Sequence, residues 1–318
     1  MKLNKESQIR PKKIYNQYIN LVKKDLKLYD FKYHKISSCP FCKCKTSNLF
    51  FKKFDFNYLK CNFCESIYSF ERPKFKDLSN YYKNSKSNSF WYEKFWPTVK
   101  DNRIKYIFSK RVNYIVKNKK KLNLKFSNYY DIGSGNSEFL NLFQKKIKRK
   151  VWGIEPSAKK YNKSDEVVII NSLFENTKLK NETASFVTAF ELIEHILDPY
   201  NFIKKIFKFL RKNGTVIISF TDPTGFELNT LKHRSTQFFP PLHLNFMSIY
   251  SCYIILKEIG FRESKILSFG ELDIDIVKNN YRFKKPNTIL NSFMNIKDSQ
   301  KFIKDYNLSS HKWLIARK

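Results

Sequence analysis

Short runs of apolar residues alternate with helical patterns through the centre of the chain, between residues 126 and 219. Four runs have strand length and nearly continuous apolar character, at residues 151–154, 167–170, 185–190 and 215–219. Such runs are typical of strands buried on both faces. Residues 201–211 have an amphipathic helical pattern, and Lys212-Asn213-Gly214 follows it as a stop signal. Strands that alternate with helices predict a parallel, doubly wound α/β sheet.

Patterns outside this centre predict further elements. Residues 14–28 have apolar positions near helical spacing, and residues 77–125 predict a helical connector. Beyond the sheet we expect a loop over 220–244, a helix over 247–260, and the last two strands, paired antiparallel, at 266–269 and 313–317. The loop follows the carboxyl end of a strand, where ligands of open α/β sheets bind, so we expect it to cover a bound substrate. The pattern leaves the structure of an insertion over residues 270–308 open.

A glycine-rich turn stands between the first strand of this region and its helix. The turn has the sequence Asp131-Ile132-Gly133-Ser134-Gly135, and Glu155 follows the next strand. Glycines let a backbone approach a ligand closely, and an acid roughly 20 positions later accepts hydrogen bonds from both hydroxyls of a ribose. The phosphate-binding pattern G-x-G-x-x-G fails, because Glu138 stands at its sixth position. We therefore expect an adenosine-containing cofactor without phosphates, whose ammonium group is received by Asp131.

This turn resembles motif I of class I S-adenosylmethionine (SAM)-dependent methyltransferases, and Glu155 matches the acid of their motif II. Ser137 stands where many members have a third glycine. Residues 194–199 and 243–246 are similar to the EH…DP and HLNF signatures of a large bacterial group of these enzymes. The resemblance extends over residues 90–318. It implies a doubly wound, mostly parallel seven-stranded Rossmann-like methyltransferase sheet, with SAM as the cofactor.

The resemblance also implies a set of residues around the cofactor. Asp131 and Glu155 have the roles given above, and the turn between them supplies its backbone. We assign cofactor contacts to Asp131, Gly133, Ser134, Gly135, Glu155, Phe174 and Phe190.

Methyl transfer to a hydroxyl or carbon acceptor also requires a base that removes a proton. The candidate catalytic residues are His195, Glu194 and His243. His195 follows the fourth strand, where the acceptor pocket of this fold lies, and an unperturbed imidazole pKa near 6.5 suits a base at neutral pH. The alternative is that Glu194 and His195 only cap the turn after the strand. With Glu191 and the distant His243 they also resemble the metal-binding set of small-RNA 2′-O-methyltransferases, in which two carboxylates and two imidazoles hold a divalent ion. This requires Glu191, Glu194 and His195 to share one face of a helix.

Two C-x-x-C pairs precede this domain, Cys39-Pro40-Phe41-Cys42 and Cys61-Asn62-Phe63-Cys64. Two such knuckles converge on one tetrahedral ion, so the spacing predicts a zinc ribbon with Cys39, Cys42, Cys61 and Cys64 as ligands. A closed four-ligand shell leaves no place for water, which makes the expected Zn²⁺ structural rather than catalytic. We expect neither Cys44 nor His34 to be a ligand.

Charge and composition bear on partners and location. The chain has 61 basic and 28 acidic residues, and the resulting formal charge of +33 would suit nucleic acid. The basic residues are spread along the whole chain, and few Gly (7) and Met (3) beside abundant Lys and Asn are typical of an AT-rich genome, so nucleic acid is not favoured. No apolar run approaches the roughly 20 residues of a membrane span. The charged start and Cys252, which lies outside the cysteine pairs of the sequence, predict a cytoplasmic protein.

These patterns together predict three parts and one enzymatic function. Residues 1–75 are a basic lead-in with the zinc ribbon. Residues 76–125 are the helical connector, and residues 126–318 are the SAM-dependent methyltransferase domain. We predict O- or C-methylation of a small hydroxylated acceptor, a sugar or a related metabolite, because a zinc module ahead of this core resembles the deoxysugar C-methyltransferases. The alternatives are an RNA methyltransferase that binds its substrate with the ribbon and a basic surface, and a non-catalytic adaptor with a degenerate cofactor fold.

Overall fold

The structure is a computed structural model that describes residues 5–157, 165–281 and 288–318. The chain divides into two compact units, which we describe separately. The sheet unit consists of Ile104–Phe220, Ile249–Leu267 and Trp313–Lys318. The ribbon unit consists of Met1–Arg103, Thr221–Ser248 and Ser268–Lys312. This division does not test the three parts expected from the sequence, which stay a prediction.

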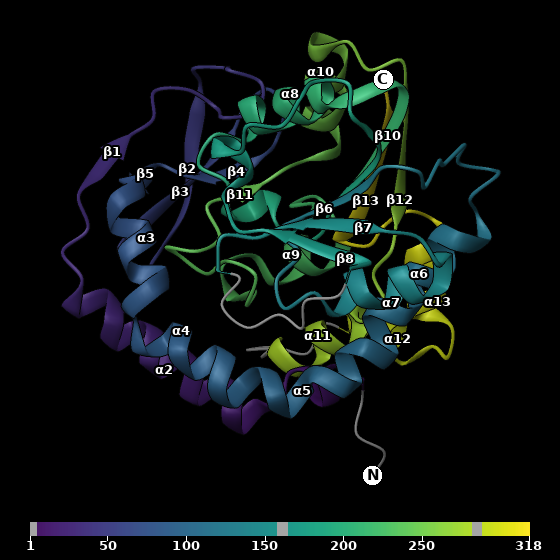
Figure 1. Cartoon of the computed structure of the whole chain (residues 1–318). Helices are drawn as coiled ribbons and strands as arrows, with labels where there is room; N and C mark the ends of the chain where they lie inside the picture. The colour runs from purple at the N-terminus through teal and green to yellow at the C-terminus, as the bar shows by residue number, and fades with distance from the viewer. Residues whose placement is uncertain (1–4, 158–164, 282–287) are drawn as a thin grey trace. The chain divides into compact units, whose positions relative to one another are not determined.

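A seven-stranded sheet with the order β12-β13-β10-β9-β6-β7-β8 forms the framework of the sheet unit (Figure 1). Its strands are β6 (Tyr129–Ile132), β7 (Val151–Ile154), β8 (Val167–Ile170), β9 (Ala184–Ala189), β10 (Leu210–Thr221), β12 (Glu263–Ser268) and β13 (His311–Arg317). Each neighbouring pair from β10 to β8 is parallel. At one end of β12 the Arg262 amide donates to the Arg317 carbonyl. At the other end the Phe269 amide donates to the His311 carbonyl, so β12 and β13 are antiparallel. The predicted mostly parallel Rossmann-like sheet is confirmed.

Helices cover both faces of this sheet. They are α6 (Ser109–Lys117), α7 (Glu138–Ile147), α8 (Pro199–Phe209) and α10 (Ile249–Ile259). Helix α6 packs against α7 and α8 packs against α10, and the two pairs lie on opposite faces (Figure 1). Helix α7 buries Phe139, Leu140 and Phe143, which are spaced along one face. The Phe143 ring lies 4.5 Å from that of Tyr129 in β6, and this contact fixes α7 behind the turn that joins them.

The boundary between α8 and β10 differs from the sequence prediction. The helix ends at Phe209 instead of residue 211, and the strand begins at once with the buried Leu210. Residues 212–214 lie inside β10, where the register to β9 shifts between Leu210 and Thr215. Asn213 takes a left-handed conformation (φ 61°), and its amide donates to the carbonyl of Lys318 at 3.0 Å. The expected stop signal is therefore an irregularity in the strand that pairing with β13 stabilises.

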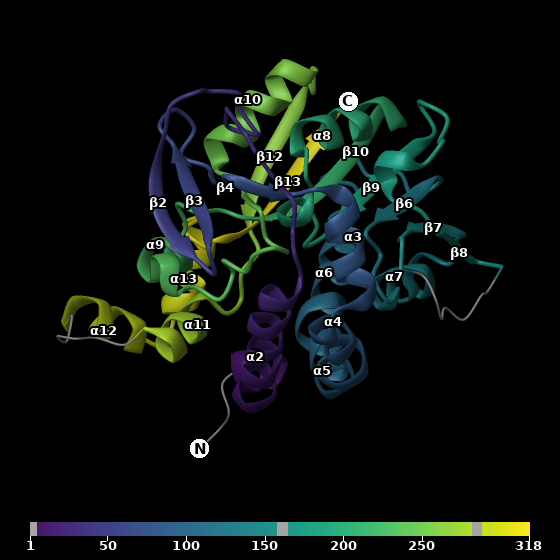
Figure 2. The same ribbon diagram turned by 90° about the vertical axis from the view of Figure 1, so that its left-hand side faces the viewer.

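The ribbon unit contains two small antiparallel sheets, of which the larger can be followed in Figure 2. In the first, β1 (Tyr33–Lys35) pairs with β5 (Glu71–Pro73). The second has the order β11-β4-β3-β2 and consists of β2 (Ser47–Lys53), β3 (Phe56–Cys61), β4 (Ile67–Ser69) and β11 (Asn245–Phe246). Strand β11 belongs to the HLNF segment. This segment therefore adds a strand to the ribbon, a pairing between positions far apart in the chain that local patterns do not predict.

Most of the remaining ribbon unit is helical. Its helices are α1 (Lys5–Ile9), α2 (Lys12–Leu28), α3 (Phe75–Asn84), α4 (Lys86–Phe90), α5 (Trp96–Arg103), α9 (Phe226–Leu231), α11 (Asp273–Asn280), α12 (Thr288–Asn295) and α13 (Ser299–Asp305). The helix predicted at 14–28 and the helical connector are confirmed by α2 and by α3 to α6. The loop expected over 220–244 instead contains α9, and the insertion over 270–308 forms α11, α12 and α13, with residues 282–287 outside the described ones.

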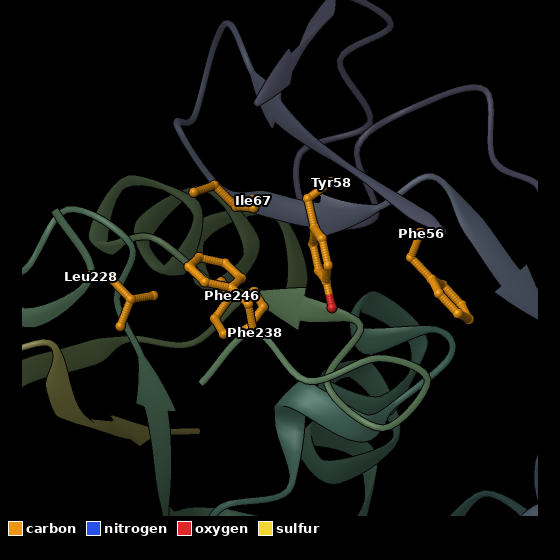
Figure 3. Close-up of a cluster of buried hydrophobic side chains, with 6 residues drawn as sticks. All are labelled: Phe56, Tyr58, Ile67, Leu228, Phe238 and Phe246. Atoms are coloured by element: carbon orange, nitrogen blue, oxygen red, sulfur yellow. The ribbon is translucent and has the colours of Figure 1, made fainter. Parts of the chain in front are cut away.

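A cluster of buried side chains joins the ribbon strands to residues 221–248 (Figure 3). Phe56, Tyr58 and Ile67 come from the ribbon, and Leu228, Phe238 and Phe246 come from the later segment. The ring of Phe238 lies 4.3 Å from that of Phe246 and 5.4 Å from that of Tyr58. The Tyr58 hydroxyl donates to the carbonyl of His243 at 2.7 Å. Residues 221–248 are thus part of the core of this unit rather than an unpacked loop.

None of the helices in the part of the chain that the structure describes combines the length and the apolar character that a bilayer span requires.

Candidate functional site

The glycine turn follows β6 and takes three left-handed backbone positions. These are Gly133 (φ 72°), Gly135 (φ 53°) and Ser137 (φ 62°). The positive φ of Gly133 favours glycine, and a Cβ there would lie 2.9 Å from a methyl carbon of Leu192, which would have to shift. No described atom lies within 4 Å of where a Cβ on Gly135 would be, so the space beside this residue is open. The turn thus presents exposed backbone to a space that a ligand can enter.

Glu155 is connected directly to this turn. It follows β7, is 8% exposed, and its Oε2 accepts a hydrogen bond from the Gly135 amide at 3.0 Å. Its Oε1 accepts from the Ser157 amide at 3.0 Å and from the Ser157 hydroxyl at 2.5 Å. The structure therefore brings together the glycine turn and the acid that the sequence placed twenty positions apart. Oε1 already accepts two bonds, whereas Oε2 accepts one and has a second lone pair, which leaves acceptor capacity for a ligand hydroxyl.

Asp131 lies in β6 one position before the end of the strand, and it is 4% exposed. Its Oδ1 accepts a hydrogen bond from the Thr188 hydroxyl at 2.6 Å, and that hydroxyl accepts in turn from Tyr129 at 2.6 Å. Burial raises the pKa of Asp131 to about 7, while the Thr188 bond and the charge of Arg111 lower it. A carboxyl with this pKa ionises readily once a cation lies beside it, which suits a site for an ammonium group.

Two buried hydroxyls complete the turn. Ser134 is 8% exposed and Ser137 is 2% exposed, and neither hydroxyl has a hydrogen-bond partner among the described residues. Buried hydroxyls are nearly always bonded in folded proteins. The unmatched pair therefore fits a polar ligand at the turn.

A further glycine, Gly153 in β7, was missed by the sequence analysis. It lies opposite Asp131 in the sheet, and a Cβ there would lie 2.6 Å from the Ser134 hydroxyl and 2.9 Å from Leu140. Gly153 therefore gives the turn and helix α7 the space to pack on β7. A glycine within an otherwise apolar strand is the signal that would have found it.

The two phenylalanines assigned to the cofactor lie in different surroundings. The half-buried Phe190 ring follows β9 and lies 5.0 Å from Phe139 and 5.1 Å from Trp313. Phe174 is 3% exposed and packs against Phe202 of α8 at 5.5 Å. Its described ring contacts belong to the core, and its cofactor role stays a prediction.

The acidic and histidine residues after β9 do not form the helical face that metal binding would need. Only residues Ile193–His195 form a short 3₁₀ turn, which contains the buried Glu194 and the half-buried His195. Glu191 lies before this turn in a left-handed conformation (φ 51°). The described residues contain one cluster with the geometry of a metal site, and it is made of cysteines. The helical arrangement behind the RNA 2′-O-methyltransferase alternative is therefore wrong for this segment.

His243, the third base candidate, belongs to the ribbon unit. Its Nδ1 lies 2.5 Å from the carbonyl oxygen of Gln237, a contact that holds the ring in place just before β11. Asn245, two residues later, accepts a hydrogen bond from the buried Arg72 at 2.6 Å. These contacts give the HLNF segment a structural role within this unit.

The four predicted metal ligands lie together. The sulfurs of Cys39, Cys42, Cys61 and Cys64 are all within 4.8 Å of one another. Cys44 lies outside this group, with its sulfur 3.2 Å from the Thr46 hydroxyl, and His34 is exposed on β1. Four thiols at this spacing match the donor set of a tetrahedral zinc site.

The backbone of the two cysteine knuckles repeats one geometry. The Lys43 amide donates to the carbonyl of Cys39, and the Glu65 amide donates to the carbonyl of Cys61. Lys43 and Glu65 each follow the second cysteine of their pair, and both have φ 60°. The Ser248 hydroxyl donates to the carbonyl of Cys64, which connects the second knuckle to the segment after β11. Backbone hydrogen bonds of the two knuckles thus help to position the four cysteines.

Comparison with known protein families decides the class of the sheet unit. Residues 101–263 match the model of a family described as a methyltransferase domain, and this match spans half of the chain. The chain belongs to this family. A comparison with curated protein sequences gives no match.

Solved structures of methyltransferases resemble the chain at low identity. A SAM-dependent methyltransferase from Archaeoglobus fulgidus is 17% identical with a TM-score of 0.48, over 70% of this chain and 100% of that one. A second SAM-dependent methyltransferase, from Thermotoga maritima, is 18% identical with a TM-score of 0.45, over 70% of this chain and 97% of that one. The geranyl diphosphate C-methyltransferase from Streptomyces coelicolor is 12% identical with a TM-score of 0.45, over 71% and 83%. Likeness at this level gives no information about the substrate of this chain.

The methyltransferase also has polar groups that the sequence analysis did not assign. In the sheet unit, Arg111 of α6 lies close enough to Asp131 for its charge to lower the pKa of that carboxyl. In the ribbon unit, His311 Nε2 lies 3.1 Å from an oxygen of Glu227, which is fully buried. The Ser235 hydroxyl donates to the other Glu227 oxygen at 2.9 Å. A buried carboxylate of this kind orients an imidazole and selects its tautomer.

Proposed function

We propose that this methyltransferase uses SAM and methylates a small hydroxylated acceptor, a sugar or a related metabolite. The observation that carries the cofactor assignment is the hydrogen bond from the Gly135 amide to Glu155, with Asp131 immediately before the turn. This arrangement supports an adenosine cofactor that has an amino-acid tail and no phosphates. The bound cofactor supplies a methyl group on a sulfonium, which is already a strong electrophile.

Each residue of the turn has a separate task in this proposal. Glu155 accepts hydrogen bonds from the two ribose hydroxyls, one at the remaining lone pair of Oε2 and one at Oε1 in exchange for the bond from the Ser157 hydroxyl. Asp131, once ionised, receives the ammonium group of the tail. The hydroxyls of Ser134 and Ser137 supply hydrogen bonds that they do not make among the described residues. The open space beside Gly135 gives the ligand room at the backbone.

The acceptor hydroxyl needs a base, and we propose His195 for it. His195 follows β9, whose carboxyl end lies at the same edge of the sheet as the end of β6. Ligands of open α/β sheets bind at this edge. An imidazole is the side chain best suited to act as a base near neutral pH, and the half-buried His195 lies next to the buried Glu194 in the 3₁₀ turn. His243 is a further candidate, held by the Gln237 carbonyl in the ribbon unit.

The cysteine cluster is proposed to bind a structural Zn²⁺. The support is the donor set of four thiols and the repeated backbone geometry of the two knuckles. The metal stabilises the ribbon strands, since structural zinc sites contribute directly to folding. With four protein ligands it has no open position, so no step of methyl transfer involves it.

Cofactor binding is tested by calorimetric titration with S-adenosylhomocysteine (SAH). We expect micromolar binding by the wild type, and a loss of affinity of about 10-fold or more in Glu155→Ala and Asp131→Ala, since each removes a hydrogen-bonding charge. Glu166→Ala is the matched control, because Glu166 is exposed just before β8 and should not affect binding. A folded wild type that binds no SAH would contradict the proposed function and favour the adaptor.

Metal binding is tested by elemental analysis of the purified protein. We expect one zinc per chain, loss of zinc in Cys39→Ser and Cys64→Ser, and a lower melting temperature in both variants. Cys44→Ser is the control, because Cys44 is in the same segment but outside the cluster. Zinc retained by Cys64→Ser, or lost from Cys44→Ser, would refute this ligand set.

The base is tested once transfer of a radiolabelled methyl group to a panel of sugars and nucleotide sugars has identified an acceptor. His195→Ala should lower kcat by about 10²- to 10⁴-fold, the usual contribution of a general base, while SAH affinity stays unchanged. His34→Ala, an exposed histidine on β1, serves as the control. Wild-type rates in His195→Ala would remove it from the mechanism.

A further inference from the structure

Arg111 forms a small cluster at the carboxyl edge of the sheet unit. One of its terminal nitrogens donates to Oε1 of Glu191 at 2.5 Å. The guanidinium carbon lies 4.8 Å from the centre of the Phe190 ring. The Arg111 side chain is 11% exposed, whereas that of Glu191 is 53% exposed. The cation is therefore fixed and largely buried, and its anionic partner lies toward solvent.

Glu191 is positioned by its own backbone as well as by Arg111. Its left-handed conformation is uncommon for a residue with a Cβ. Its amide donates to the Ser219 hydroxyl at 2.7 Å, and that hydroxyl lies 3.1 Å from Glu191 Oε1. The next residue, Leu192, is the side chain that a Cβ on Gly133 would meet. The segment that carries the Glu191 carboxylate thus lies over the glycine turn.

The neighbourhood of Arg111 and Asp131 has the chemistry of an α-amino acid site. Such a ligand carries an ammonium and a carboxylate on one carbon, so a tail whose ammonium lies at Asp131 has its carboxylate close by. Arg111 lies near enough for its charge to act on Asp131. A guanidinium binds carboxylates through two parallel hydrogen bonds. A single oxygen of Glu191 occupies it in this structure.

We propose that Arg111 binds the carboxylate of the cofactor's amino-acid tail, and that Glu191 occupies this place until the cofactor displaces it. The inference rests on the proposed use of SAM. Displacement costs little on the Glu191 side, because that carboxylate is already half in solvent and water screens its attraction to Arg111. Arg111 exchanges one carboxylate for another and is not left buried without an anion.

The test compares two ligands that differ only at the tail. SAH has the amino-acid group, and 5′-methylthioadenosine has the same nucleoside and thioether without it. We expect Arg111→Gln to weaken SAH binding by about 10- to 100-fold and to leave 5′-methylthioadenosine binding unchanged. Glu191→Gln should tighten SAH binding by about 2- to 5-fold, since the competing charge of the half-exposed Glu191 is removed, and should not alter 5′-methylthioadenosine binding.

Two matched variants control for loss of charge. Arg211→Gln removes a half-buried arginine near the start of β10 that donates a hydrogen bond to the Ser127 hydroxyl. Glu182→Gln breaks the exposed ion pair to Lys318. Neither should change the affinity for either ligand. If Arg111→Gln fails to fold, Glu191→Gln and Arg111→Lys decide the matter, with Arg111→Lys expected to bind SAH more weakly than the wild type because lysine lacks the planar fork.

The outcomes separate this inference from the proposed function. No SAH binding by the folded wild type contradicts the proposed function itself. Wild-type binding of SAH with unchanged affinity in Arg111→Gln overturns the inference alone. Equal weakening of SAH and 5′-methylthioadenosine would make Arg111 a structural residue, and weaker SAH binding in Glu191→Gln would overturn the displacement.

Discussion

The hydrogen bond between the Gly135 amide and Glu155 is the constraint on which the candidate site depends. It joins the ends of two neighbouring parallel strands, β6 and β7, through the turn that opens helix α7. The three left-handed positions of that turn aim its backbone toward open space, and Gly153 gives the turn room to lie on β7. Asp131, one position before the end of β6, is thereby held beside the turn in a buried place where its carboxyl is nearly balanced between two protonation states.

Local sequence patterns were sufficient to predict the glycine turn and the position of Glu155 beside it. Continuous apolar runs identify strands buried on both faces, and the glycines and acids follow those strands directly, so spacing alone brings Gly135 and Glu155 together. Patterns failed where pairing is distant. Strand β11 pairs with β4 across more than half of the chain, and the start of β10 depends on contacts with Lys318. No sequence pattern distinguishes Arg111, because it is one of 61 basic residues. Only the fold places it near Asp131.

The ribbon unit shows how a cysteine cluster and a distant segment are built into one core. The Ser248 hydroxyl donates to the carbonyl of Cys64, β11 extends the sheet of β4, and the hydrophobic cluster of Figure 3 joins side chains of both segments. A zinc ion in the cluster would therefore stabilise the HLNF segment along with the ribbon itself.

The most direct test of this account is the number of protons exchanged when SAH binds. Calorimetric titrations at pH 7 in two buffers with different ionisation enthalpies measure it. An Asp131 carboxyl with a pKa of about 7 is half protonated in the free protein and ionised beside an ammonium group, despite the nearby Glu155 charge. The account predicts release of about half a proton at pH 7, rising toward one at pH 6 and vanishing at pH 8.5 and in Asp131→Asn. Binding without buffer dependence would contradict it.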